Sequence, residues 1–143
     1  MILMRYLVTG GLGFIGSNFI RYILEKYSSA EVINLDALKY GSNPNNLKDI
    51  DNYGRYQFIK GDIADDKLIT RILNDYDIDV IVNFAAESHV DRSISNPLPF
   101  LKSNTNGTFV LLNAIRKVNK DIRLIPVSYT HLRAHETRHD LVC

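Results

Sequence analysis

The segment that most constrains the fold spans residues 5–27, RYLVTGGLGFIGSNFIRYILEKY, in which an apolar run, a cluster of glycines and an amphipathic segment follow one another. The apolar run is typical of a buried parallel strand. Apolar residues then recur at helical spacing, which predicts a helix with one face against a sheet. That face comprises Ile15, Phe19, Ile20, Ile23, Leu24 and Tyr27. The segment therefore predicts a strand, a glycine loop and a helix.

The glycine loop has the composition of a phosphate-binding turn. A helix N-terminus offers free N–H groups and the positive end of the helix dipole, and glycines allow a pyrophosphate to approach them. Gly11, Gly13 and Gly16 fit G-x-G-x-x-G. Gly10, Gly13 and Gly16 fit the other common spacing, G-x-x-G-x-x-G. The sequence is therefore compatible with both patterns.

The context of the loop supports a dinucleotide. The next expected strand, residues 31–35, ends in Asp36, where an acidic side chain typically binds the adenosine ribose. Its carboxylate can accept hydrogen bonds from both ribose hydroxyls and repels a 2′-phosphate, which favours NAD over NADP. Lys39 weakens that exclusion slightly.

The rest of the chain alternates between strand and helix patterns. Further strands are expected at 56–59, 79–86 and 122–125, and helices at 64–76 and 100–118, whereas residues 37–50 are rich in Asn and Gly and predict a loop. The predicted fold is α/β, a Rossmann-like doubly wound parallel sheet of five strands in the order 3-2-1-4-5. Leu111, Ala114, Ile115 and Val118 form the expected buried stripe of the last helix.

The carboxyl ends of parallel strands are where ligands bind in such folds. Asp62 follows the third strand, and two interpretations stay open: a hydrogen bond to the adenine amino group, or a cap for the next helix. The residues after the fourth strand, Ala85 to Ser88, are expected to face the cofactor, with Ser103 and Asn104 in reach of the nicotinamide ribose.

The composition and net charge limit the kinds of partner that we expect this chain to bind. The 143 residues suffice for one domain, and a net charge of +1 disfavours binding to nucleic acid or a membrane surface. No uncharged run is long enough to span a bilayer. Cys143 is the sole cysteine, so no internal disulfide can form, and we expect a cytoplasmic protein without a metal site.

Several short motifs of the sequence resemble those of a known family. TGGLGFIGS, Asp36 and NTNGT (residues 104–108) resemble the extended short-chain dehydrogenases/reductases. Within them, LDALKYGSNPNNL and AAESHVDRSI resemble the dTDP-glucose 4,6-dehydratases. The resemblance implies a lyase that uses bound NAD to take hydride from sugar C4 and return it to C6 as water is lost. It also implies dTDP-glucose as substrate and a homodimer through the helix after Pro99.

The resemblance further implies which residues bind the cofactor. Phe14 and Ile15 would contact the pyrophosphate, and Ser88 would contact both the nicotinamide side and the sugar. The complete predicted cofactor set is Gly10, Gly13, Phe14, Ile15, Gly16, Asp36, Ala37, Leu38, Lys39, Asp62, Ile63, Phe84, Ala85, Ala86, Glu87, Ser88 and Ser103.

After Val127 and Ser128 the sequence departs from the family. The family continues into T-D-E-V-Y-G and later Tyr-x-x-x-Lys, whereas this chain reads YTHLRAHETRH, so we expect no catalytic residue within it. The expectation is an incomplete NAD-binding domain over 1–126, truncated before the substrate domain, and a foreign tail over 127–143. VSYTHLRAHET resembles a translated transposase-end sequencing adapter.

Two further motifs are interpreted as incidental. Tyr22 and Lys26 fit Y-x-x-x-K but lie on the glycine-loop helix, and the H-E-x-x-H of residues 135–139 lacks a third zinc ligand. His89 and Asp91 could contact sugar or shape their loop. Three other functions stay open: another NAD-dependent nucleotide-sugar epimerase or dehydratase, a non-catalytic dinucleotide-binding module, and a truncation unable to fold.

Overall fold

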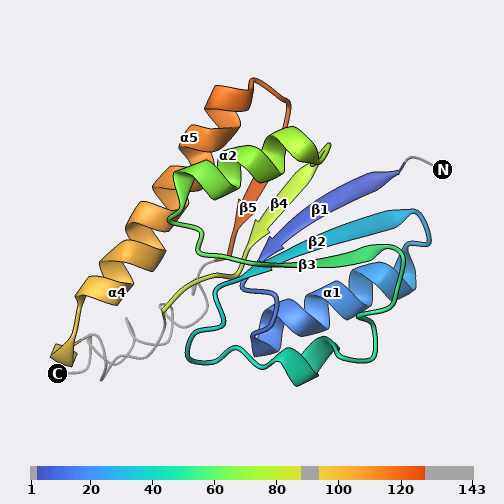
Figure 1. The fold of residues 1–143 in the computed structure, drawn as a ribbon, viewed down its shortest axis with the longest axis horizontal. Coiled ribbons are helices and arrows are strands. Elements are labelled where there is room, and N and C mark those ends of the chain that lie inside the picture. The colour runs from blue at the N-terminus through green and yellow to red at the C-terminus, as the bar shows by residue number, and fades with distance from the viewer. Residues whose placement is uncertain (1–2, 88–93, 128–143) are drawn as a thin grey trace, which may run out of the picture.

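The computed structural model describes residues 3–87 and 94–127, which form one parallel sheet covered by helices on both faces (Figure 1). Its five strands are ordered β3-β2-β1-β4-β5, as the sequence predicted. Their bounds are β1 Met4–Thr9, β2 Ala30–Asp36, β3 Tyr56–Lys60, β4 Val80–Asn83 and β5 Arg123–Pro126. The carboxyl ends of all five strands therefore lie at the same edge of the sheet.

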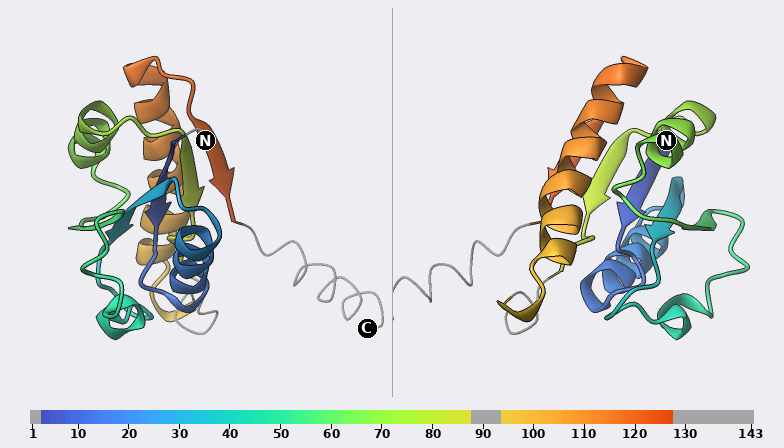
Figure 2. Two further views of the ribbon diagram at one scale, coloured as in Figure 1. Left: turned by 90° about the vertical axis from the view of Figure 1, so that its right-hand side faces the viewer. Right: turned by 60° about the vertical axis from the view of Figure 1, so that its left-hand side comes forward.

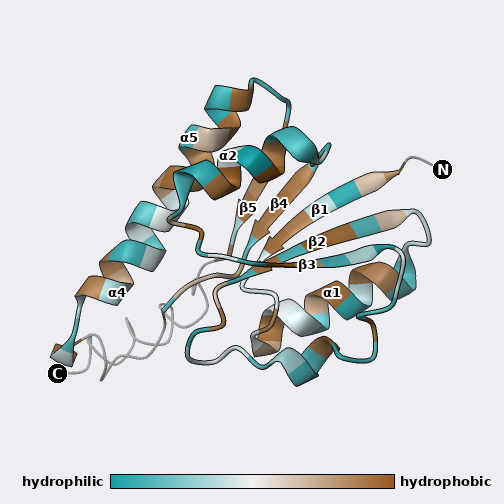
Figure 3. Ribbon diagram, in the orientation of Figure 1, coloured by the Kyte–Doolittle hydropathy of each residue, from teal (hydrophilic) through white to brown (hydrophobic). Residues whose placement is uncertain are grey.

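The two faces of the sheet have separate cores. Helix α1 (Phe14–Lys26) and the 3-10 helix η1 (Pro44–Leu47) cover one face, and α2 (Asp66–Asp75) and α5 (Thr108–Val118) cover the other (Figures 1 and 2). Consecutive residues of one strand pack into different cores: Leu7 packs toward α2 and α5, whereas Val8 packs toward α1. This two-sided burial explains why β4 is apolar along most of its length (Figure 3).

Helix α1 corrects one expectation. Its buried residues are Gly16, Ser17, Ile20, Ile23 and Leu24, whereas Ile15 is 58% exposed and Tyr27 is 44% exposed. Ile15 lies in the first turn of the helix, where Gly16 and Ser17 are the buried residues. Tyr27 lies past the last helical residue, because it is the C-cap of α1 and has extended backbone.

The segment expected as one helix over 100–118 has three parts. Helix α4 (Leu98–Phe100) continues into a π-helix, η2 (Leu101–Gly107), and then into α5. The wider turn of a π-helix is rare and often lies at functional sites. Of the predicted stripe, Leu111 and Ala114 are fully buried, while Ile115 and Val118 are partly buried against the same core.

Two other boundaries differ from expectation. Strand β4 ends at Asn83, the last of its residues paired with β1 and β5, and residues 84–87 continue as coil instead of strand. The Asn-rich loop contains η1, in which Asn43 accepts a hydrogen bond from the Asn45 N–H and Leu47 is 1% exposed. A buried leucine therefore ties this loop to α1.

Candidate functional site

A cavity of about 480 Å³ opens at the carboxyl ends of the strands. The glycine loop, the loops after β2 and β3, the coil after β4, and η2 all contribute to it. Its lining comprises Gly10, Gly13, Phe14, Ile15, Gly16, Leu35, Asp36, Ala37, Lys39, Tyr40, Gly41, Ser42, Gly61, Asp62, Ile63, Phe84, Ala85, Ala86, Glu87, Ser103 and Val127.

The glycine loop is shaped by close approaches of backbone. Gly10 has φ +68°, and a Cβ atom there would lie 2.7 Å from the Ala85 nitrogen. A Cβ atom on Gly16 would lie 2.5 Å from the Gly10 carbonyl oxygen. Gly13 is different, because its Cβ position meets no atom nearer than 3.3 Å. Gly10 and Gly16 are therefore required by the fold, whereas Gly13 mainly keeps the cavity side of the loop open.

The first turn of α1 is suited to an anion. Gly13 is the N-cap residue, no side chain caps the helix, and its first turn contains no acidic residue. Phe14 is 82% exposed beside the cavity. The helix N-terminus thus offers backbone N–H groups and the positive end of its dipole to the cavity.

Asp36 lies at the end of β2 and is only 4% exposed. Its Oδ2 accepts a hydrogen bond from the Leu12 N–H at 3.0 Å, and its Oδ1 accepts from the Leu38 N–H at 2.8 Å and the Ser42 hydroxyl at 2.6 Å. A carboxylate has about four acceptor positions, so about one remains free. Binding both hydroxyls of a ribose would therefore displace one of these donors, and the mobile hydroxyl of Ser42 is the simplest to replace.

Asp62 lies across the cavity, after β3. Its Oδ2 accepts a hydrogen bond from Lys39 Nζ at 2.8 Å, and its Oδ1 accepts from the Ala64 N–H at 3.0 Å. Burial by itself raises the pKa of Asp62, but the hydrogen bonds from Lys39 and Ala64 and the charges of Lys39 and Lys102 outweigh it and hold the pKa below its usual value.

The expected cap is one turn further on. Asp65, which accepts from the Leu68 N–H at 3.0 Å, is the N-cap of α2. Asp62 instead stabilises the turn before the helix, so the cap interpretation of Asp62 is wrong.

The coil after β4 is held against η2. The Asn104 side chain accepts a hydrogen bond from the Glu87 N–H at 2.8 Å and donates one to the Glu87 carbonyl oxygen at 2.9 Å. Ser103, on the same π-helix, is 7% exposed and lines the cavity. Phe84 packs against Phe19 of α1, with ring centroids 5.3 Å apart. The coil is thereby fixed from both faces of the sheet.

The structure brings together fifteen of the predicted cofactor residues, which are all of them except Leu38 and Ser88. Leu38, with φ +55°, is absent from the lining, although its N–H orders Asp36. Ser88 lies outside the described residues, as do His89, Asp91 and the H-E-x-x-H segment. Six further residues line the cavity but were not in the predicted cofactor set: Leu35, Tyr40, Gly41, Ser42, Gly61 and Val127. For Gly41 and Ser42, the glycine and serine content of the loop after Asp36 was the sequence signal that could have identified them.

Tyr22 and Lys26 lie away from the cavity. Lys26 donates a hydrogen bond to the Tyr22 hydroxyl on the outer face of α1, where Tyr22 is 50% exposed. Within residues 3–87 and 94–127, no cluster of three potential metal ligands is found. In the same part of the chain no helix is both long and apolar enough to cross a membrane.

The fold and the edge at which its cavity opens are those of the doubly wound, Rossmann-type α/β proteins. The chain belongs to the GDP-mannose 4,6 dehydratase family, whose model matches residues 7–131. Among curated proteins, it is 45% identical over 135 residues to a dTDP-glucose 4,6-dehydratase of Xanthomonas campestris, covering 92% of this chain and 38% of that protein. A dTDP-glucose 4,6-dehydratase of Salmonella typhimurium is 46% identical over 114 residues, covering 80% of this chain and 31% of that protein.

The comparison with solved structures finds proteins of the same kind. The dTDP-glucose 4,6-dehydratase of Bacillus anthracis in complex with NAD superposes with a TM-score of 0.78 at 43% identity, covering 87% of this chain and 37% of that one. The Streptomyces venezuelae enzyme with NAD bound gives 0.78 at 46% identity, covering 85% and 38%. These matches confirm the predicted family resemblance and fold. The chain spans 31–38% of the length of these relatives.

Proposed function

We propose that this chain is the NAD-binding part of a dTDP-glucose 4,6-dehydratase. The carrying observation is the cavity that joins the glycine loop, Asp36 and the coil after β4 at one edge of the sheet. The relatives named above support the choice of cofactor and of enzyme, because two solved dehydratases carry NAD.

The residues present fit such a dinucleotide. The uncapped first turn of α1 suits a pyrophosphate, and Gly13 leaves space for it. Asp36 is a buried acceptor for a ribose hydroxyl, and Asp62 is a further acceptor nearby for the adenine amino group. Ala85 and Ala86 present little side-chain bulk where a flat ring would lie. All seventeen residues predicted from the sequence, Leu38 and Ser88 included, remain part of this proposal.

The proposal for the whole protein goes further. Bound NAD would supply transient hydride transfer, by which dTDP-glucose becomes dTDP-4-keto-6-deoxyglucose with loss of water. The Thr-Asp-Glu and Tyr-x-x-x-Lys groups for that chemistry would lie in sequence that this chain does not carry. We also propose a cytoplasmic homodimer, in which the continuous helical segment of α4, η2 and α5 packs against the same segment of a second copy. Leu98, Leu101, Phe109 and Leu112 support this, because each is more than half exposed.

The proposed boundary of the NAD-binding part remains residue 126, where β5 ends, with a foreign tail over 127–143. The family match ends at residue 131. A long sequencing read of the source DNA across codon 127 tests this point. Continuation into Thr-Asp-Glu supports it, whereas a reading frame identical to the present one refutes the foreign tail.

Cofactor binding is tested by titrating the 143-residue chain with NAD and with ADP-ribose in a calorimeter. We expect both to bind. Gly13→Val should abolish binding while leaving the urea midpoint close to that of the parent, because its side chain would occupy the open side of the loop. Gly54→Ala, at a site with no atom within 4 Å, is the matched control and should bind normally. A folded parent that binds neither ligand refutes the proposal.

A second candidate within the same class is another NAD-dependent nucleotide-sugar enzyme. The UDP-glucose 4-epimerase of Stenotrophomonas maltophila with bound NAD superposes with a TM-score of 0.75 at 28% identity, covering 86% of this chain and 36% of that one. The protein translated from a reading frame that continues into Thr-Asp-Glu would be tested for turnover of dTDP-glucose, GDP-mannose and UDP-glucose. The sugar nucleotide that it converts decides between the two enzymes. A third candidate, a non-catalytic dinucleotide-binding module, predicts binding with no turnover of any of the three.

A further inference from the structure

Two lysines converge on one carboxylate at the rim of the cavity. Lys39 Nζ lies 2.8 Å from Asp62 Oδ2, and Lys102 Nζ lies 3.7 Å from the same oxygen. They come from different elements: Lys39 follows β2, Asp62 follows β3, and Lys102 belongs to the π-helix η2. The Asp62 side chain is 24% exposed and that of Lys39 is 44% exposed, so the pair is only partly screened by solvent.

The position of Lys39 gives this pair a consequence for cofactor choice. In Rossmann-type sites an acidic residue after the second strand binds the 2′-hydroxyl of NAD, whereas a basic residue nearby accommodates the 2′-phosphate of NADP. Lys39 lies only three residues after Asp36 and lines the same cavity. Its ammonium group is, however, directed onto Asp62.

We propose that Asp62 is a determinant of the preference for NAD over NADP, because it neutralises Lys39 and Lys102 beside the ribose site. This inference rests on the proposed function. At neutral pH the formal charges of Asp36, Asp62, Lys39 and Lys102 sum to zero, and removal of the Asp62 charge leaves a net positive rim. That rim attracts a 2′-phosphate and frees Lys39 to reach it.

The two carboxylate oxygens allow the charge to be removed selectively. Oδ1 accepts from the Ala64 N–H, and Oδ2 receives the lysine. An asparagine at this position retains an amide oxygen for Ala64, and it replaces the charged oxygen that faces Lys39 with a neutral NH₂ group. Any weakening of an adenine contact affects NAD and NADP equally, and therefore cancels in the ratio of their dissociation constants.

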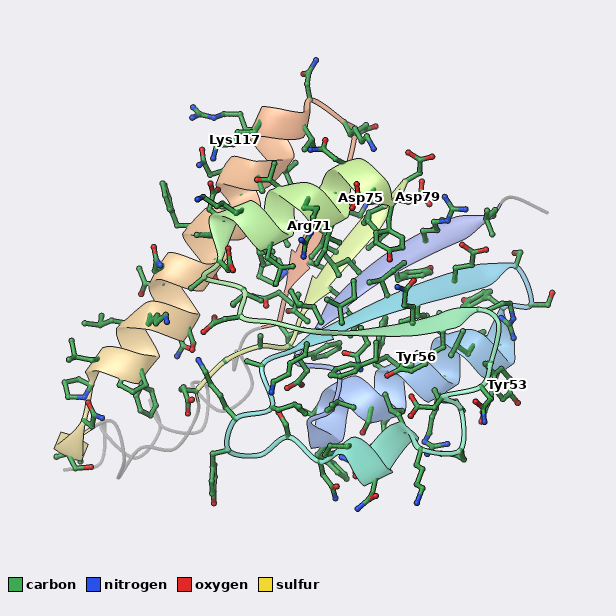
Figure 4. The ribbon with its side chains drawn as sticks, in the orientation of Figure 1. Tyr53, Tyr56, Arg71, Asp75, Asp79 and Lys117 are labelled. Atoms are coloured by element: carbon green, nitrogen blue, oxygen red, sulfur yellow. The ribbon has the colours of Figure 1, made fainter. Side chains whose placement is uncertain are left out.

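The experiment is calorimetric titration of the full 143-residue chain with NAD and with NADP. We expect Asp62→Asn to improve binding of NADP relative to NAD by roughly tenfold at low salt, as for one added charge contact. Adding Lys39→Met to Asp62→Asn should return most of this ratio toward the parent value. Asp66→Asn is the matched control, because Asp66 is not among the cavity-lining residues and holds Lys117 of α5 at 2.7 Å (Lys117 is labelled in Figure 4), and it should leave the ratio unchanged.

The outcomes separate this inference from the proposed function. NAD binding by the parent with an unchanged ratio in Asp62→Asn overturns the role of Asp62 and leaves NAD binding intact. An equal shift in Asp66→Asn also overturns it, because the effect would then follow net charge alone. A folded parent that binds neither NAD nor ADP-ribose refutes the proposed function, and the inference with it.

Discussion

Replacing Gly10 with alanine tests whether the glycine loop is shaped by the fold itself. The new Cβ atom would lie 2.7 Å from the Ala85 nitrogen and 2.8 Å from both the Ala85 Cα atom and the Phe84 carbonyl carbon. All three atoms belong to backbone, so no side chain can move aside. The left-handed φ of +68° adds its own cost for an L-residue.

The magnitude follows from these two terms. A left-handed conformation costs about 1–2 kcal/mol and overpacking costs about 1–3 kcal/mol, so the loss is about 2–5 kcal/mol. Since domains are stable by only about 5–15 kcal/mol, much of the stability would be lost. Urea unfolding should show a midpoint lower by roughly 1–2 M with an unchanged slope.

Two other glycines separate the terms. Gly41 has φ +88° with no atom within 4 Å of its Cβ position, so Gly41→Ala should lose only about 1–2 kcal/mol. Gly54 also has open space and no left-handed φ, so Gly54→Ala should be neutral or slightly stabilising. If Gly10→Ala costs no more than Gly41→Ala, the close approach of the two strand ends is not what requires glycine here.

Three further outcomes are expected. Asn104→Ala should speed hydrogen exchange of the Glu87 N–H and cost about 1–2 kcal/mol, whereas Asn104→Asp should keep that N–H protected; equal exchange in all forms would contradict the bridge. Tyr56→Phe should cost about 1–3 kcal/mol in urea unfolding, because it leaves the buried Asn34 amide without its partner at 2.9 Å, and an unchanged midpoint would contradict this. The pKa of Asp62 is lowered in the folded state. The ionised side chain therefore stabilises the fold above the usual pKa of 3.8, and this stabilisation is lost as the pH falls below that value. The urea midpoints measured at pH 6 and at pH 3 should differ less in Asp62→Asn than in the parent.

The side chains around Asn34 and Tyr56 show what local patterns leave out. Both residues lie in strands, on β2 and β3, and their polar groups meet within the core beneath α1 (Tyr56 is labelled in Figure 4). Asn34 is fully buried, and a Cβ atom on Gly11 would lie only 2.2 Å from its Oδ1 atom. A strand pattern predicts that such a residue faces a core, but it does not predict which glycine or tyrosine it will meet.

Much of the candidate site was predictable for a physical reason. The strand, glycine loop and helix are adjacent in sequence, so their spacing alone places Gly10, Gly13 and Gly16 at a helix N-terminus. Parallel strands then bring their carboxyl ends to one edge, and this places Asp36, Asp62 and the residues after β4 together without any knowledge of side-chain contacts.

By itself, the amino-acid sequence determined the parallel sheet, its strand order and the edge at which a ligand would bind, because hydrophobic periodicity and glycine spacing reflect contacts within one element or between neighbouring elements. Only the tertiary structure decided the partners of Asp36 and Asp62. Leu12 and Lys39 reach these carboxylates across 24 and 23 residues of sequence. The orientation of such polar side chains depends on how separate loops pack, and no local periodicity records it.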